Sequence, residues 1–200
     1  MMRFRKVIDA AMVEGAASLM SMIYELRDLG LWRGERGTNL LDGGCPFYDT
    51  YRTADGGYMA VGALEPRFFE VFVERLGIDR TGKPDQYDEG GWQEMRREIA
   101  AAFATRTRDE WSSVFAGADA CVTPVLPMSD APHHPHNAQR GTFVDVGGSI
   151  QPGPAPRFSR TVTGQPGTQP EAGEHSDEIL ACMGIDDDRI AELRSAGVVY

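Results

Sequence analysis

The pattern of hydrophobic and polar residues in the middle of the chain predicts a β-hairpin that leads into a helix. Aromatic and β-branched residues are frequent over residues 47–53 and again over 58–63, a composition typical of strands. An Asp-Gly pair lies between the two runs and favours a tight turn, because glycine accepts a positive φ. Apolar side chains then recur at helical spacing until Gly77. Pro66 suits the first position of this helix, where its missing N–H costs nothing.

Similar patterns predict elements on both sides of this centre. Residues 7–31 indicate the end of a strand followed by a long helix, and residues 121–126 indicate a buried strand. Helices are expected over 92–103 and 107–115, and the second begins with a Thr followed three residues later by a Glu, the sequence of a capping box. The remaining predictions are a short strand, an extended Pro- and Gly-rich surface segment and two terminal helices, at residues 142–146, 151–170, 175–183 and 187–195.

Composition and charge narrow the class of protein. Hydrophobic residues make up 42% of the 200, enough for a globular core. The net charge of −10 argues against binding to nucleic acid, which requires clustered Lys and Arg. We expect no membrane span, since no apolar run is long enough, and residues 1–6 lack the apolar core of a signal peptide. Three widely spaced cysteines, at positions 45, 121 and 182, fit a reduced cytoplasmic protein better than a disulfide scaffold.

One carboxylate is placed where a catalytic group could be held. Glu65 directly precedes Pro66 and is expected at the N-cap of the predicted helix, where the helix macrodipole favours its ionised form. Acidic residues at helix starts commonly do no more than cap the helix. A glycine turn, two strands and a helix around one carboxylate also make a rigid mount for catalysis. Both interpretations stay open on the local pattern.

A set of methionines forms a second candidate site. Met12, Met20, Met22 and Met59 could provide a soft surface for a fatty acyl chain, because thioethers repack readily. Ordinary helix packing is the alternative. Replacing Met20 and Met22 by Leu should separate the two.

A group of histidines suggests a metal site but fits one poorly. His133, His134 and His136 lie in one proline-stiffened stretch, and two of them are adjacent. Zinc prefers well-spaced ligands on a rigid frame, usually four of them. We therefore expect no metal here.

Several long motifs carry a resemblance to a known family. Residues 41–48, 51–56 and 61–66 read LDGGCPFY, YRTADG and VGALEP. These runs resemble the α-methylacyl-CoA racemase family, a branch of the family III CoA-transferases. Further matching runs occur at residues 7–15, 119–125, 133–134, 140–143 and 173–175.

The resemblance implies an α/β fold that corresponds to the C-terminal half of a racemase. Residues 1–38 would be a remnant of the large domain, with its last strand, a long helix and a linker. Residues 39–200 would form the small domain of an interlocked dimer. The implied reaction epimerises the carbon α to an acyl-CoA thioester by removing and returning a proton. Glu65 matches an assisting glutamate of the family, whereas the family's catalytic His and Asp have no counterpart in this sequence.

The implied partners follow from the same resemblance. The substrate would be an acyl-CoA, with no cofactor beyond the CoA of that substrate. The chain would form a homodimer or pair with a separate N-terminal large-domain chain. A CoA-transferase-like subunit is an alternative, and so is a non-catalytic remnant that serves as a dimerisation module.

Overall fold

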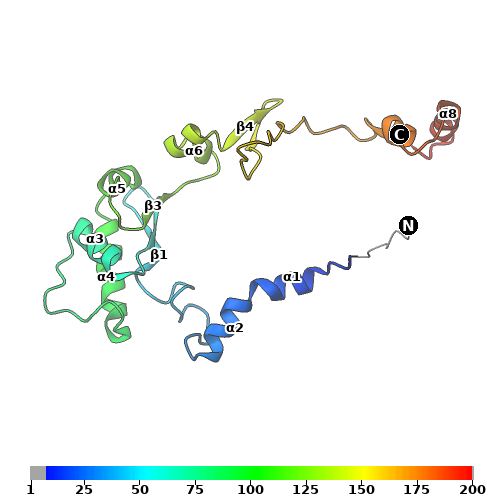
Figure 1. Ribbon diagram of the computed structural model, residues 1–200. Coiled ribbons are helices and arrows are strands. Elements are labelled where there is room, and N and C mark those ends of the chain that lie inside the picture. The colour runs from blue at the N-terminus through cyan, green and yellow to red at the C-terminus, as the bar shows by residue number, and fades with distance from the viewer. Residues whose placement is uncertain (1–7, 200) are drawn as a thin grey trace. The chain divides into compact units, whose positions relative to one another are not determined.

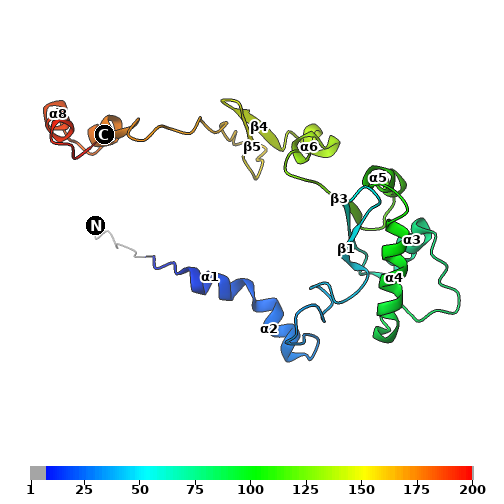
Figure 2. The same cartoon turned by 180° about the vertical axis from the view of Figure 1, so that it is seen from behind.

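The computed structural model describes residues 8–199 (Figures 1 and 2). Its contacts divide the chain into two compact units, Met1–Leu126 and Pro127–Tyr200. This division does not test the expected domain boundary between residues 38 and 39, which stays a prediction. The predicted strand end at Val7 falls partly outside the described residues.

A three-stranded antiparallel sheet organises the first unit. The strands are β1 (Tyr48–Arg52), β2 (Tyr58–Gly62) and β3 (Val122–Val125), with β2 in the centre. The predicted hairpin between β1 and β2 is confirmed. Its turn is closed by the Thr53 N–H, which donates to the Gly57 carbonyl at 2.9 Å, and Gly56 takes a φ of 82°. A positive φ at this position is the reason that glycine is favoured in the turn.

Helices fill the connection from β2 to β3. They are α3 (Pro66–Leu76), the short 3-10 helix η1 (Glu89–Gly91), α4 (Trp92–Phe103) and α5 (Arg108–Phe115). As predicted, Pro66 opens α3, and Gly77 ends it with a φ of 74°. The predicted capping box of α5 is also present, because the Thr107 side chain accepts from the Glu110 N–H and the Glu110 side chain accepts from the Thr107 N–H. Figures 1 and 2 both show α3 and α4 on the same side of the sheet.

The core lies between these helices and one face of the sheet. Tyr51, Met59 and Val61 point into it from the strands. Aromatic rings dominate the helical side, and Trp111 packs edge-on against Phe103 with 5.3 Å between ring centroids. The buried indole N–H is satisfied by the Phe103 carbonyl at 2.9 Å.

The other face of the sheet is exposed. Alternate residues such as Tyr48, Thr50 and Tyr58 lie on it, as the period of two along a strand requires. The prediction of a buried strand over 121–126 is therefore wrong in one respect. The strand exists as β3, but it is an edge strand in which only Val122 is buried. Short apolar runs do not reveal whether one or two faces will be covered.

Two short helices precede the sheet, where one long helix was predicted. They are α1 (Met12–Leu19) and α2 (Ser21–Asp28), and neither contains a buried residue. The break falls at Met20, whose N–H donates to the Ala17 carbonyl in a tight turn. Ser21 adds a side-chain bond to the Ser18 carbonyl at 2.7 Å, a local contact that competes with a regular helix. Residues 8–11 form no strand.

The second unit consists of small local pairs of elements. They are η2 (Ala131–His133) with α6 (Pro135–Arg140), β4 (Phe143–Val146) with β5 (Ser149–Pro152), and α7 (Ser176–Cys182) with α8 (Asp187–Ser195). The predicted strand at 142–146 and both terminal helices are confirmed. The strand β5 was not predicted, and it takes the first residues of the expected 151–170 segment. The rest of that segment has no helix or strand, as expected.

The fold mixes helices and strands, which confirms the α/β prediction in its coarse form. All strand pairs of the described residues are antiparallel. Within residues 8–199, no helix has both the length and the apolar character that crossing a bilayer requires.

Candidate functional site

Glu65 occupies the N-cap position of α3, as the sequence predicts. Its backbone is extended, with φ −72° and ψ 140°, and its side chain is exposed. The carboxylate accepts no hydrogen bond from the first turn of the helix. It also makes no ion pair with another described residue, so it is not used for capping. The side chain is thus available for other chemistry, although its catalytic role stays a prediction.

The main chain before Glu65 is anchored on both sides. The Gly62 N–H donates to the Cys121 carbonyl at 2.9 Å, which extends the pairing of β2 with the segment before β3. The Ala63 N–H donates to the Phe47 carbonyl at 3.0 Å, which extends the pairing with the segment before β1. Glu65 therefore follows directly from the central strand with little freedom of the backbone.

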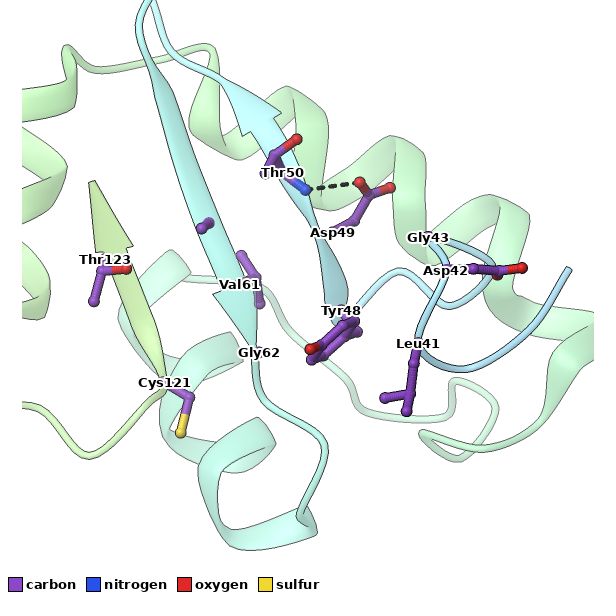
Figure 3. Close-up of a pocket in the computed structure, with 11 residues that line it drawn as sticks. Leu41, Asp42, Gly43, Tyr48, Asp49, Thr50, Val61, Gly62, Cys121 and Thr123 are labelled. Carbon is purple, nitrogen blue, oxygen red and sulfur yellow. Dashed lines mark hydrogen bonds between the residues drawn. The ribbon is translucent and has the colours of Figure 1, made fainter. Parts of the chain in front are cut away.

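A pocket with a volume of about 530 Å³ lies on the exposed face of the sheet and ends near this point. Figure 3 shows Tyr48 and Cys121 on either side of the end of β2 at Gly62, with Leu41 beside Tyr48. The wall is mostly apolar or small. The lining residues are Leu41, Asp42, Gly43, Tyr48, Asp49, Thr50, Ala60, Val61, Gly62, Cys121 and Thr123.

Two sets of partly buried polar contacts hold the turn that forms one wall of the pocket. Arg96 of α4 pairs with Asp49 and donates to the carbonyls of Gly43 and Gly44 at 2.7 and 3.1 Å. The Asp42 carboxylate accepts from the N–H and side-chain amide of Asn39 at 2.8 and 2.7 Å.

These bonds also fix the charge of the Asp42 carboxylate. Burial of Asp42 disfavours its ionised form. Hydrogen bonds from Asn39, Gly37 and Gly44 outweigh burial and hold the pKa of this carboxyl below its ordinary value. Asp42 and Asp49 thus serve the architecture of the wall.

Cys121 lines the pocket and also interacts electrostatically with Glu65. It has a φ of 50°, and it is exposed at the entrance to β3. Burial raises the pKa of its thiol, the negative charges of Glu65 and Asp119 raise it further, and Arg67 opposes them. The thiol is therefore protonated at neutral pH and gives the pocket a neutral wall close to Glu65.

The four predicted methionines do not share one environment. Met12 is 91% exposed on α1, and Met20 and Met22 are about half exposed. Met22 lines a second cavity of about 520 Å³, together with Trp32, Trp92 and other apolar residues. Met59 is fully buried in the core. The adaptable acyl surface therefore stays a prediction for Met12, Met20 and Met22, whereas the position of Met59 fits the alternative of ordinary packing.

The predicted histidines lie in the second unit, around η2 and α6. His133 and His136 are exposed and His134 is partly exposed. Among residues 8–199, no group of three or more His, Cys, Asp or Glu side chains is arranged to hold a metal ion.

Sequence reasoning missed part of the site. Tyr48 and Cys121 were noticed only as members of a motif and of a cysteine count, and Gln86 and Tyr87 were not noticed at all. Gln86 and Tyr87 contact the residues before Glu65 from more than twenty positions away in sequence. No local pattern reports contacts over such a separation.

The chain that carries this sheet, pocket and carboxylate is similar to a known class of proteins. The model of CoA-transferase family III matches residues 5–176, and the chain therefore belongs to this family. Within the family, it is 44% identical to the α-methylacyl-CoA racemases of Mus musculus and Homo sapiens. Each match covers 196 residues, which are 97% of this chain and 51% of the relative.

A solved structure supports the fold. The crystal structure of a CAIB/BAIF family protein from Brucella suis aligns with a TM-score of 0.67 at 17% identity, over 88% of this chain and 47% of that one. At this identity the likeness shows the fold alone. The chain thus spans about half the length of the curated relatives and of the structure that it matches.

Proposed function

We propose that this chain provides one wall of the substrate site and an assisting carboxylate, Glu65, in an enzyme that epimerises the carbon α to an acyl-CoA thioester. One observation carries the proposal. The Glu65 carboxylate stands at the end of the central strand without a capping bond, three residues beyond the pocket residue Gly62. The high identity to two α-methylacyl-CoA racemases supports it.

The reaction needs more than one group. A base takes the α-proton, and the electron pair of the broken C–H bond moves onto the thioester carbonyl to give an enolate. An acid then returns a proton to the opposite face of the carbon. Each group must come within hydrogen-bond reach of the α-carbon from its own side.

The pocket itself offers few candidates for these roles. Asp42 is held by hydrogen bonds and Asp49 is paired with Arg96. Glu65 is the remaining carboxylate, and a single carboxylate cannot serve both faces of the α-carbon. We therefore assign the two principal proton-transfer groups, a His and an Asp, to a segment outside these 200 residues. Glu65 would orient that Asp or share a proton with it, as coupled carboxylates do.

The proposed substrate fits the character of the pocket. Leu41, Tyr48 and Ala60 give an apolar surface for an alkyl branch next to the thioester. The neutral Cys121 thiol adds no charge that would repel an enolate. Proton transfer of this kind calls for no cofactor beyond the CoA of the substrate, and we place the reaction in the cytoplasm.

The missing segment would come from a large domain, in a homodimer or on a separate N-terminal chain. Apolar side chains on α1 and α2 are exposed in this chain, among them Met12, Leu19 and Met22. Exposed apolar groups of this kind are typical of surfaces that another segment covers.

A CoA-transferase subunit is the second candidate, since the matching family bears that name. Transfer would leave a covalent thioester between CoA and a carboxylate of the enzyme during turnover. Intact-mass spectrometry of protein incubated with acyl-CoA detects such an adduct, and a racemase forms none. A non-catalytic dimerisation module would show neither the adduct nor exchange.

The proposal is tested by α-proton exchange of a 2-methylacyl-CoA in D₂O, followed by mass spectrometry. The chain is measured alone and after co-expression with the N-terminal half of the mouse racemase. We expect exchange only in the complex. Exchange by the chain alone would show that it has a complete set of bases. A complex that forms but does not exchange the proton would contradict the racemase assignment.

A further inference from the structure

The residues between the pocket and Glu65 form a tight turn whose carbonyls are fixed from outside. The Leu64 N–H donates to the Gly62 carbonyl at 3.0 Å, which closes a three-residue turn. The carbonyls of Ala63 and Leu64 accept hydrogen bonds from side chains of the segment between α3 and η1.

Gln86 provides one of these side chains. Its amide nitrogen donates to the Ala63 carbonyl at 3.0 Å and to the Leu64 carbonyl at 2.9 Å. Only 9% of Gln86 is exposed. Because the nitrogen faces two acceptors, the orientation of the amide is fixed by its partners.

Tyr87 provides the second side chain that binds these carbonyls. Its hydroxyl donates to the same Leu64 carbonyl at 2.5 Å. The ring is held edge-on against the buried Phe47, with 5.3 Å between ring centroids. Burial raises the pKa of the hydroxyl, and electrostatic interactions with Cys45 and Glu65 raise it further, so the hydroxyl is present as a donor at neutral pH.

We propose that Gln86 and Tyr87 are positioning residues for Glu65: together they clamp the carbonyls of the two residues before it and so set the direction in which its carboxylate leaves the sheet. The geometry stands without any assumption about the reaction. Its value for catalysis rests on the proposed function, in which the carboxylate must be held to within about half an ångström of its working position.

The pattern of bonding is hard to explain as packing alone. The amide oxygen of Gln86 is buried and has no hydrogen-bond partner among the described residues. An unsatisfied buried polar atom destabilises a fold, and an apolar residue would avoid that cost. What the amide provides in return is the pair of bonds to Ala63 and Leu64.

Cys121 offers a readout of the Glu65 position that needs no enzymatic activity. Burial raises the pKa of its thiol, the charges of Glu65 and Asp119 raise it further, and Arg67 lowers it. In a Cys182→Ser background, Cys121 is the one exposed thiol of the described residues, since Cys45 is buried. The rate of alkylation by iodoacetamide, measured against pH, then gives the midpoint for Cys121.

The experiment compares this midpoint between variants of the full chain. Glu65→Gln removes the negative charge and lowers the midpoint. Tyr87→Phe keeps the ring on Phe47 and removes only the hydroxyl, and Gln86→Leu removes the amide. If the clamp holds Glu65 near Cys121, Tyr87→Phe and Gln86→Leu should each lower the Cys121 alkylation midpoint by about half of the Glu65→Gln shift or more. In combination with Glu65→Gln, neither substitution should lower this midpoint further.

The matched control is Tyr58→Phe, which removes a hydroxyl of similar exposure on β2 and should leave the midpoint unchanged. Tryptophan fluorescence confirms that each variant is folded, and Tyr87→Phe remains informative if Gln86→Leu unfolds. An unchanged midpoint in Tyr87→Phe, next to a lowered one in Glu65→Gln, would overturn the clamp. A midpoint that Glu65→Gln does not move would overturn the placement of Glu65 beside Cys121. Neither result depends on whether the enzyme is a racemase.

Discussion

Nearly all of the buried apolar side chains among the described residues lie in the first compact unit, whereas in the second unit only Ile190 is buried. The first unit has a sheet with three helices on one face and a continuous aromatic core. The second has hairpins of strands and helices that are held mainly by local hydrogen bonds. A two-stranded hairpin alone is marginally stable in water.

This difference shows that the stability of the chain comes mainly from the first unit, and that the second unit leaves apolar surface exposed. The first unit can hold Glu65 and the pocket in place because its own core supports them. The second unit, like α1 and α2, leaves apolar side chains exposed, among them Ile179 and Met183. Such surfaces are consistent with burial against another segment.

The largest expected effect separates the two units directly. Trp111→Ala should destabilise the chain by about 3–5 kcal/mol, because it removes a large side chain from a packed core. Ile190→Ala should leave the unfolding transition seen by tryptophan fluorescence unchanged, since Trp32, Trp92 and Trp111 all lie in the first unit. Urea titration of both variants measures this. An equal loss in Ile190→Ala would show that the second unit supports the first.

A pair of methionines sharpens the comparison within the first unit. Met59→Ala should cost about 2–5 kcal/mol, as expected for a fully buried side chain. Met12 is 91% exposed on α1, and Met12→Ala should have no measurable effect on the same urea transition. A loss of stability in Met12→Ala would indicate that α1 packs on the core or on a second copy.

The turn at the pocket wall should tolerate little change. A Cβ at Gly44 would lie 2.4 Å from the Asn39 carbonyl oxygen, so Gly44→Ala should destabilise the chain by about 1–3 kcal/mol through overpacking. Gly34 is the control, because its Cβ would meet nothing within 4 Å. Thermal unfolding of both variants tests the prediction. Equal midpoints would mean that the turn is not rigid.

The smallest effect concerns acid stability. The pKa values of Asp42 and Asp55 are lower in the folded chain than their ordinary values, for Asp55 chiefly through the Thr53 hydroxyl. A lowered pKa adds stability that is fully present above the unfolded pKa of about 3.9 and is lost as the pH falls below it. Asp42→Asn should therefore weaken the fall in urea midpoint between about pH 5 and pH 3. Asp9→Asn, in an exposed segment, should leave the fall unchanged.

The elements that the sequence predicted are those specified by neighbouring residues. Pro66 and Gly77 mark the ends of α3, and Thr107 with Glu110 marks the start of α5. These signals act over a few positions, so one sequence suffices to find them. The break at Met20 and the strand β5 were missed, because a short serine contact and a Gly-Gly turn are weak signals beside the surrounding pattern.

The site was predictable only in part, for a related reason. Glu65 could be placed at the N-cap from Pro66 alone. That its side chain makes no capping bond, and that Gln86 and Tyr87 hold the preceding carbonyls, depends on how distant segments pack. The pocket likewise combines residues from the turn before β1, from β2 and from β3. Family motifs pointed to these residues without showing what they touch.

The most direct test of the account is the role of the Glu65 carboxylate. Glu65→Gln is compared with Glu74→Gln, an exposed glutamate on the same helix, in the complex with the N-terminal half of the mouse racemase. The measurement is the rate of α-proton exchange of a 2-methylacyl-CoA in D₂O. We predict a fall of about 10²-fold or more for Glu65→Gln, the size of a typical acid–base contribution, and no change for Glu74→Gln. Exchange at the wild-type rate in Glu65→Gln would show that Glu65 does no more than mark the start of α3.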